Sequence, residues 1–426
     1  MALENLLGSP LYRASSPLVL GWSDDQLRRI VHHLEPVLPE DISVEMRFAV
    51  AAVARSIVAE KVLTGLGVHY ARAKTPYSQP KRYRTGDPRF SWHYVTKAMD
   101  HLRLAGLIEH AVGEYWPGHP GKGLESVALA TGQLLCLVGP LIDEWDARAM
   151  FGNLETIVLR GRGRCDVDYE ETEATVAMRD QVQIVNDALL GLELQHRGRR
   201  IVVPPVRRIF SGSFERGGRF YCHGESFQNM SFGQRSELEV MIDGQLHRMV
   251  EVDYRNLHIA MAYSEAGEDI PDGDQYRIDG FDRGVVKLAV NTMLNARRGA
   301  TLAVANALHD DPDLRRVSGV DLRDRVACRA LAEQVVAAIE RQHQPIKDYF
   351  GSNCGARFQR KDSDMAMQVM AAMIHSTGRC PLPIHDSFIV AVADAELLKR
   401  TMGEVSTRHG LRLDLKVLRL PGSLSV

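Results

Sequence analysis

The sequence predicts an α+β protein in which an antiparallel sheet carries two aspartates, with helices between its strands and a helical domain before it. Two apolar strand patterns predict the sheet, Met249–Tyr263 with Asp253 and Cys380–Val392 with Asp386. Between them, Phe281–Arg297 repeats apolar residues with helical spacing. Strand, helix and strand in this order indicate a mixed domain whose sheet holds both carboxylates.

The composition is that of an ordinary globular protein. The chain has 426 residues, 45% of them apolar and 25% charged, which is enough for two or three domains. The formal net charge is only −2, so a nucleic acid would have to be bound by local cationic patches. No apolar run approaches the ~18 residues of a membrane span, and the first residues make a poor signal peptide. The six cysteines contain no CxxC pair, which argues against zinc and disulfides and favours a reducing cytoplasm.

Residues 1–140 are predicted to form a helical DNA-binding domain. One helix is expected over Val44–Leu66. A second is expected to begin near Ser91 and to end near Gly106. Two short strands around a Gly- and Pro-rich turn are expected after it. A helix followed by a hairpin resembles a winged helix-turn-helix domain, here over roughly 40–135. The alternative is a helical domain with a hairpin and no role in DNA binding.

A basic, turn-rich segment, Arg72–Phe90, precedes the second of these helices. Phosphate binding needs clustered cations. We therefore predict nucleic-acid contacts from Lys81, Arg82 and Arg84 in this segment and from Lys122 at the hairpin tip.

The two aspartates and the helix between them point to a chemistry. Asp253 and Asp386 each stand where a strand pattern meets a turn, so two strands can present them to one pair of metal ions. Arg283 and Lys287 lie one helical turn apart on the intervening helix. A carboxylate, a cationic helix and a second carboxylate are the parts needed for metal-assisted nucleotidyl transfer. The alternative for the two cations is a solvated helix face.

Five short motifs follow one another between residues 210 and 395. They are Gly218-Arg219 with Gln228-Asn229, Asp253-Tyr254, Arg283 with Lys287, Gln359 with Asp364 and Met370, and the IHDSF segment Ile384–Phe388. In this order they resemble the palm and fingers of family A DNA polymerases, a core shared with single-subunit phage and mitochondrial RNA polymerases.

The resemblance implies a right-hand palm built on an antiparallel sheet, with helical fingers. It implies two Mg²⁺ ions, with Mn²⁺ as an alternative, held by Asp253 and Asp386 and by the Tyr254 carbonyl. It places Arg283 and Lys287 on the triphosphate of a dNTP. The implied nucleic-acid contacts are Arg219, Gln228, Asn229, Arg235, Gln359 and His385. The alternatives are a structural strand histidine for His385 and helix packing for Gln359.

Three departures from the family pattern concern the nucleotide and the size of the protein. His258 stands where the DNA enzymes carry a glutamate, and Asn291 and Asn295 stand where they carry an aromatic residue and a tyrosine. The glutamate and the tyrosine exclude a 2′-hydroxyl in those enzymes, so the choice of sugar is open and these three residues are predicted to lie near the nucleotide. Ser387 replaces a second glutamate and fits the RNA enzymes better. Nothing before residue 200 resembles a proofreading exonuclease.

The predicted organisation is a winged-helix domain (1–140), a connector or reduced thumb (141–210) and a palm with fingers (211–426). The predicted function is that of a compact, exonuclease-free, DNA-directed DNA polymerase acting on a DNA primer-template with dNTPs. One alternative is a polymerase of the same fold that makes RNA or primers from rNTPs. The other is a catalytically silent, DNA-binding replication initiator or regulator. No membrane partner is expected, and the predicted compartment is cytoplasmic.

Overall fold

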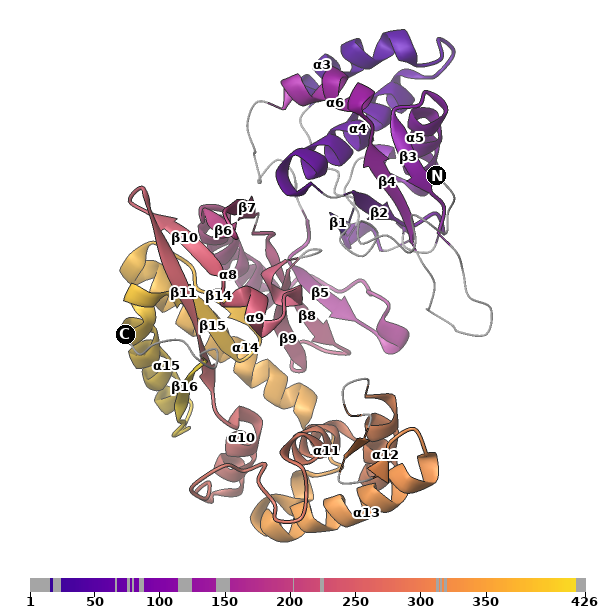
Figure 1. The fold of residues 1–426 in the computed structure, drawn as a ribbon. Helices are drawn as coiled ribbons and strands as arrows, with labels where there is room; N and C mark the ends of the chain where they lie inside the picture. The colour runs from indigo at the N-terminus through magenta and orange to yellow at the C-terminus, as the bar shows by residue number, and fades with distance from the viewer. Residues whose placement is uncertain are drawn as a thin grey trace. The chain divides into compact units, whose positions relative to one another are not determined.

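The structure is a computed structural model, and its residues form two compact units (Figure 1). Unit one contains the chain up to Arg208 together with Tyr221–Met249, and unit two contains Ile209–Phe220 together with the chain from Val250 onward. The chain therefore passes between the units three times. The residues that the structure describes are 16–17, 24–65, 67–74, 77–78, 80–83, 88–113, 125–142, 154–201, 203–222, 226–311, 314, 316–317 and 320–418.

Three helices enclose the core of the N-terminal part of unit one: α3 (Asp24–Leu34), α4 (Val44–Thr64) and α5 (Trp92–Leu104). Helix α4 begins where the Ser43 side chain accepts a hydrogen bond from the Met46 N–H at 3.2 Å. As predicted, helix α5 ends just before Gly106, which has a φ of 70°. The largest fully buried side chains of this core are Leu27, Ile30, Leu34, Ile57, Met99 and Leu102.

A small sheet packs against these helices. Strands β2 (Val68–Tyr70), β4 (Ser126–Ala130) and β3 (Ile108–Ala111) pair antiparallel in the order β2-β4-β3, and β1 (Ser16–Pro17) pairs parallel with β2. Strands β3 and β4 are the two that the sequence predicts after the helix. Helix α6 (Gly132–Val138) follows β4.

The remainder of unit one contains helices and strands of two further sheets. Strands β7, β6, β10 and the first half of β11 pair antiparallel in that order. The elements are β5 (Ile157–Arg160), α8 (Glu173–Leu190), β6 (Leu194–His196), β7 (Arg199–Ile201), β8 (Val206–Ser211), β9 (Gly217–Cys222), α9 (Phe232–Arg235), β10 (Leu238–Ile242) and β11 (Gln245–Tyr254). Strands β8, β9 and β11 each run from one unit into the other.

The two units differ from the three predicted segments. Residues 154–208, predicted as a connector or reduced thumb, belong to unit one. They are bound there by side chains of the basic segment, because Arg82 Nε donates to Asp168 at 2.9 Å and the Tyr83 hydroxyl donates to the Val167 carbonyl at 2.9 Å. Residues 221–249, predicted as part of the palm, also belong to unit one, where β10 pairs with the first half of β11.

In unit two, β11 pairs with both β15 and β16. Strands β14 (Leu382–Ile384) and β15 (Ser387–Ala391) form an antiparallel hairpin, and β16 (Leu415–Leu418) runs antiparallel to β11. Val252 and Tyr254 of β11 are buried, and the Tyr254 hydroxyl donates a 2.8 Å hydrogen bond to the Met402 carbonyl of the next helix layer.

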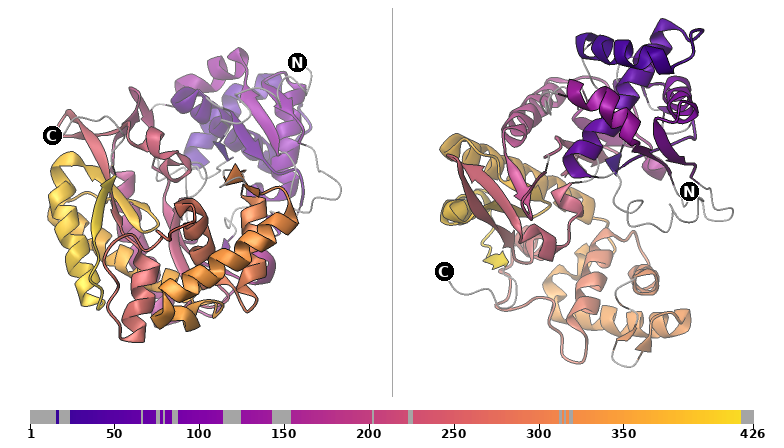
Figure 2. Two further views of the ribbon diagram at one scale, coloured as in Figure 1. Left: turned by 60° about the horizontal axis from the view of Figure 1, so that its bottom comes forward. Right: turned by 45° about the horizontal axis from the view of Figure 1, so that its top comes forward.

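Among its described residues, unit two also contains six α-helices. They are α10 (Leu257–Ala266), α11 (Arg283–Asn295), α12 (Ala300–Asp310), α13 (Arg325–Gln342), α14 (Gly355–Thr377) and α15 (Ala395–Arg408). Helices α11, α12 and α13 pack together as one group, and α15, which packs on α14 and β15, lies along the strands in both views of Figure 2. A two-strand hairpin, β12 (Arg316–Val317) and β13 (Val320–Asp321), connects α12 to α13. No helix among the described residues combines the length and apolar character needed to cross a membrane.

Candidate catalytic site

The two predicted catalytic aspartates lie at adjacent strand ends in unit two. Asp253 is the penultimate residue of β11, and Asp386 lies in the two-residue turn between β14 and β15. His385, the first residue of that turn, has a φ of 56°, the left-handed conformation that such turns require there. The Tyr254 N–H lies 3.4 Å from the Asp386 carbonyl oxygen, so the backbones of the two segments are in direct contact.

The environment of Asp253 is both buried and negatively charged. Burial, and after it the charges of Asp386 and Glu251, raise the pKa of Asp253 to about 7. Lys287 on α11 and Lys416, which lies opposite Asp253 in the β11–β16 register, act in the other direction. Burial and the neighbouring carboxylates thus both disfavour the ionised form of Asp253, and a bound divalent cation would favour it.

A third carboxylate, which the sequence prediction missed, belongs to this group. Glu251 precedes Asp253 by two residues, so both side chains lie on the same face of β11. Glu251 is only 6% exposed, Ser387 on β15 is only 4% exposed, and the serine hydroxyl donates a 2.7 Å hydrogen bond to Glu251 Oε1. The chain thus has a buried carboxylate next to Ser387. The spacing of two residues between Glu251 and Asp253 in a strand was the sequence signal that could have placed Glu251 in this group.

The donor set fits Mg²⁺. Asp253 and Asp386 offer hard carboxylate oxygens, and the backbone carbonyl of Tyr254 follows Asp253 directly. Among the described residues, no group of three or more His, Cys, Asp or Glu side chains is arranged to hold a metal ion by itself. Mg²⁺ is commonly held by one or two carboxylates and completed by water and substrate phosphates. The buried Tyr254 side chain bonds to Met402, so Tyr254 has its backbone alone to offer to a metal or a nucleotide.

Helix α11 presents one polar stripe. Arg283, Lys287, Asn291 and Asn295 follow one another at four-residue intervals and are all exposed. The helix begins where Asp282 accepts hydrogen bonds from its first turn. Its opposite face buries Val285, Val286, Ala289, Val290, Met293 and Leu294. The four predicted nucleotide-binding residues of this helix therefore share one face, and the Lys287 charge acts on Asp253.

Tyr276 is a second residue near the aspartates that the prediction missed. It is 7% exposed, and burial, followed by the charge of Asp386, raises its pKa to about 12. Its ring centroid lies 5.5 Å from the Arg283 guanidinium carbon, and Arg283 also forms an ion pair with Asp274 at 2.5 Å. Tyr276 is the one aromatic residue between positions 264 and 280, but no motif surrounds it.

Buried hydrogen bonds hold the loop that carries Asp274 and Tyr276. The intervening Gln275 carbonyl oxygen lies 3.0 Å from Nε2 of His343, and Nδ1 of His343 lies 3.1 Å from the Tyr263 hydroxyl. His343 and Tyr263 are both fully buried. The loop position is therefore set by α10 and by the end of α13.

His258 and Arg219 converge on one carboxylate. His258, in the first turn of α10, places Nε2 2.9 Å from Oδ2 of Asp362 on α14. Arg219 of β9 donates to the same carboxylate, with Nε 2.9 Å from Oδ2. The Asp362 side chain is 1% exposed. Arg219, predicted to lie along the nucleic acid, is thus engaged by Asp362 in this structure.

Three other predicted nucleic-acid contacts have local structural roles in unit one, whereas the aspartates belong to unit two. Gln228 accepts a hydrogen bond from the Cys222 N–H at 2.8 Å, Asn229 accepts one from the Ser226 N–H at 3.1 Å, and Arg235 donates to the Met230 carbonyl at 2.7 Å. Gln359 is half-buried on α14 in unit two.

Of the predicted N-terminal cations that the structure describes, Arg82 forms ion pairs within the chain and Lys81 is exposed. Arg82 binds Asp168 and Glu171, and its guanidinium lies 3.8 Å from the Tyr169 ring centroid. Lys81 is exposed. Arg84 and Lys122 lie outside the described residues.

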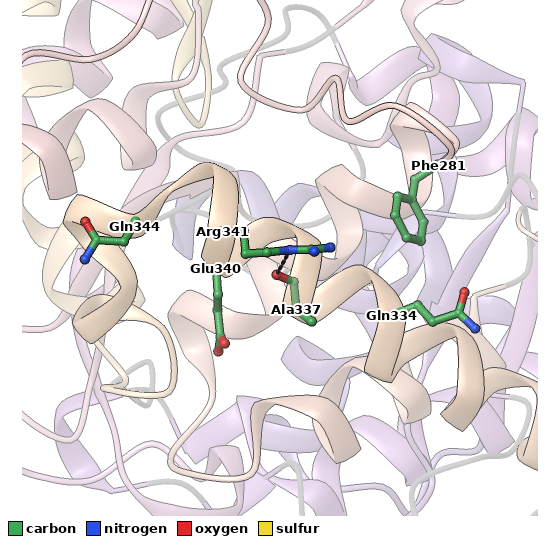
Figure 3. Close-up of a pocket in the computed structure, with 6 residues that line it drawn as sticks. All are labelled: Phe281, Gln334, Ala337, Glu340, Arg341 and Gln344. Atoms are coloured by element: carbon green, nitrogen blue, oxygen red, sulfur yellow. Dashed lines mark hydrogen bonds between the residues drawn. The ribbon is translucent and has the colours of Figure 1, made fainter.

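A surface pocket of about 650 Å³ lies on α13 and is shown in Figure 3. It is lined by Phe281, Gln334, Ala337, Glu340, Arg341 and Gln344. None of the predicted site residues lines it, and the Arg341 side chain donates to the Ala337 carbonyl of its own helix at 3.3 Å.

No protein-family model matches the sequence, and no curated protein matches it. Among solved structures, the chain is similar to the POL domain of Pol1 from M. smegmatis in complex with a DNA primer-template and dNTP. The TM-score is 0.32 and the identity is 12%, over 94% of this chain and 66% of that chain. The chain thus spans just under two thirds of the length of a DNA polymerase domain to which it is distantly similar in structure.

Proposed function

We propose that this chain is a template-directed nucleotidyltransferase of the polymerase class. One observation supports this most strongly: Asp253 and Asp386 lie at adjacent strand ends, and Lys287 of the exposed α11 stripe is near enough for its charge to act on Asp253. Two clustered carboxylates next to a cationic helix face are suited to a nucleoside triphosphate with bound metal.

Each residue then has a distinct task. Asp253 and Asp386 would hold Mg²⁺, which would supply charge neutralisation and a lowered pKa for a primer 3′-hydroxyl. Lys287 and Arg283 bind the triphosphate through charge-assisted hydrogen bonds. Arg283 exchanges Asp274 for phosphate in that step. Tyr276, whose ring lies against Arg283, limits the space beside the triphosphate.

The leading substrates are a DNA primer-template and dNTPs, as the sequence predicts. We further propose that α4, α5 and the β2-β4-β3 sheet form a winged-helix module that binds duplex DNA. The order of the helices and of the antiparallel strands in this part of unit one supports that assignment.

A second candidate is a polymerase that makes RNA or primers. Two residues favour it, because His258 and Ser387 stand where the resembled DNA enzymes carry glutamates. A catalytically silent DNA-binding initiator or regulator is the third candidate, and it would keep the winged-helix module without turnover.

A primer-extension assay with purified protein separates these functions. It uses Mg²⁺ or Mn²⁺, defined DNA templates with and without primer, and dNTPs or rNTPs. We expect incorporation by the natural chain and its loss in Asp253→Asn and Asp386→Asn, because each change removes a metal ligand and several kcal/mol of transition-state stabilisation. DNA affinity should be unchanged in both variants. Near-normal turnover in either variant would contradict the proposal, and DNA binding without any incorporation would favour the silent regulator.

A further inference from the structure

We propose that Arg207 and Arg160, on two neighbouring strands of unit one, form a binding site for a phosphate group. The site consists wholly of residues of unit one, whereas Asp253 and Asp386 belong to unit two. Its ligand is therefore additional to the triphosphate of the proposed function. Free phosphate and the backbone of a nucleic acid offer the same chemistry, and the experiment separates these two sources.

Strand β8 directs Arg207 away from its buried neighbours. Val206 and Arg208 are each 1% exposed, so alternation along the strand places Arg207 on the opposite face of the sheet. The Asn186 amide of α8 donates to the Val206 carbonyl at 3.0 Å and accepts from the Val206 N–H at 2.7 Å. Strand β5 lies beside β8 (Figure 1), and the Arg208 N–H donates to the Thr156 carbonyl just before β5 at 2.8 Å. The backbone that carries Arg207 is thus held from both α8 and β5.

The Arg207 guanidinium lacks an acceptor at its most enclosed atom. The Arg207 side chain is half-buried, its Nε is inaccessible to solvent, and no described residue accepts a hydrogen bond from that Nε. Burial, and after it the charge of Arg160, lower the pKa of Arg207, whereas the charge of Asp166 acts in the other direction. A guanidinium stays charged in proteins all the same. An enclosed cation without an acceptor costs free energy, and a bound anion would offset that cost.

Arg160 supplies the second cation, at the end of β5. Its Nε donates to Asp166 at 3.1 Å across the short hairpin of residues 157–167, and its side chain remains 34% exposed. Tyr83 fixes both arms of this hairpin, because its hydroxyl bonds to the backbone of one arm at 2.9 Å and of the other at 3.0 Å. Within the part of the chain that the structure describes, the Nη groups of Arg160 form no hydrogen bond, so they are available to a second acceptor.

A phosphate group matches this pair of cations. Arginine presents its donors in a fixed planar fork, and phosphate accepts several of them at once. Like charges on the two guanidinium groups repel each other, and an anion bound by both relieves this repulsion. A carboxylate has two oxygens in one plane, whereas a tetrahedral phosphate can accept from guanidinium groups on two different strands. Because α8 and Tyr83 already hold both strands, binding has little backbone to order.

Thermal unfolding of the full-length protein provides the test, because it needs no turnover. The protein is melted in rising concentrations of inorganic phosphate, with acetate at equal ionic strength as the comparison anion. We expect phosphate, and not acetate, to raise the Tm of the natural chain along a saturating curve, as a ligand of the folded state does. The main variant is Arg207→Met, which keeps an unbranched side chain and removes the enclosed charge. Its apparent affinity for phosphate should fall ~10-fold or more, because charge-assisted hydrogen bonds are lost.

The same variant distinguishes a binding role from a structural one. In acetate, Arg207→Met should be at least as stable as the natural chain, because it removes a cation that has no acceptor at Nε. The matched control is Arg200→Met, the same change of charge at an exposed arginine of β7. Its response to phosphate should equal that of the natural chain. Lys287→Ala should also keep the full response, which separates this site from the proposed triphosphate site.

A short single-stranded oligodeoxynucleotide and its duplex identify the source of the phosphate. If the backbone of a nucleic acid supplies it, the oligonucleotide should compete with phosphate, and Arg207→Met should reduce the salt slope of duplex binding by about 0.9. If the free anion is the ligand, the response to phosphate should persist with saturating DNA. Either result supports the site.

Three results would overturn the inference. They are a rise in Tm that acetate reproduces, a response to phosphate that Arg207→Met leaves unchanged, and an Arg207→Met protein that is less stable than the natural chain in acetate. Primer extension can succeed or fail in each of these cases, so the proposed nucleotidyl transfer stands or falls separately.

Discussion

The Ser387 hydroxyl and the Glu251 carboxylate form a 2.7 Å hydrogen bond between two neighbouring strands, with both side chains buried. The same hydroxyl oxygen lies 3.1 Å from the Ile384 carbonyl oxygen, at the start of the turn that carries Asp386. The pair therefore connects the strand of one catalytic aspartate to the turn of the other.

This bond predicts a measurable coupling in stability. Ser387→Ala should lower the free energy of unfolding by about 1–3 kcal/mol, because it leaves a buried carboxylate without its donor. The measurement is urea denaturation of the natural chain, Ser387→Ala, Glu251→Gln and the double variant. In the Glu251→Gln background the cost of Ser387→Ala should shrink, since the buried group is then neutral. Additive effects of the two changes would show that the bond contributes nothing.

The pKa of Asp253, raised to about 7, predicts how pH affects metal binding. The metal needs the ionised carboxylate, so Mn²⁺ affinity should fall by up to tenfold for each pH unit below about 7 and level off above it. Titration of the protein with Mn²⁺ from pH 5.5 to 8.5, followed by electron paramagnetic resonance, measures this. An affinity that is constant over that range would contradict the raised pKa.

The raised pKa of Asp253 also predicts how pH affects the stability of the metal-free protein. Metal affinity should rise with pH, whereas this contribution to stability should fall. A carboxylic acid with a raised pKa in the folded state stabilises the fold fully at pH values below about 4, and this contribution is lost as the pH rises through about 7. Asp253→Asn removes the charge and should raise the free energy of unfolding at pH 8 by roughly 1–3 kcal/mol. At pH 4 the variant and the natural chain should differ little. A variant less stable than the natural chain at pH 8 would exclude this account.

The α11 stripe predicts unequal effects for its two cations. Lys287→Ala should raise the nucleotide KM and lower kcat, with a combined cost of about 2–4 kcal/mol. Arg283→Ala should cost less, because Arg283 must first leave Asp274. Asp274→Asn should lower the nucleotide KM for the same reason. Steady-state kinetics on one primer-template measures all three, and an unchanged kcat/KM in both cation variants would mean that this face binds only solvent.

The N-terminal cations predict a contrast in salt dependence. Lys81 is exposed, so Lys81→Ala should reduce the slope of log K against log salt for duplex binding by about 0.9. Arg82→Ala should leave the slope nearly unchanged and instead destabilise unit one, because Arg82 binds Asp168 and Glu171. Binding curves at several salt concentrations, with a thermal melt of each variant, provide the test. Equal slopes for Lys81→Ala and the natural chain would assign this surface to another partner.

The sequence predicted those features that depend on local periodicity. Alternation along a strand is enough to locate Asp253, and four-residue spacing is enough to align Arg283 with Lys287. The prediction placed Asp386 where a strand pattern meets a turn, and the structure has a two-residue turn there between β14 and β15. Each of these patterns lies within about 15 residues of sequence, where backbone geometry decides which side chains share a face.

The remaining features depend on partners that are distant in sequence. Nothing near Arg219 announces that Asp362 will bind it, and nothing near Arg82 announces Asp168. A cluster of cations looks the same in sequence whether it binds phosphate or the carboxylates of its own chain. The division into units likewise depends on contacts that are distant in sequence, because residues 221–249 return to unit one after a short excursion into unit two.

The assignment of Ile209–Phe220 to unit two has a consequence for synthesis on the ribosome. Arg219 is made 143 residues before Asp362. At roughly 5–20 residues per second, this interval lasts about 7–30 s. Strands β8 and β9 can pair with each other and with β5 as soon as they are made, whereas the Arg219 side chain must wait for Asp362 of helix α14. During that time the Arg219 guanidinium has no Asp362 to bind, so the order of translation imposes on this protein a stage that the finished fold conceals.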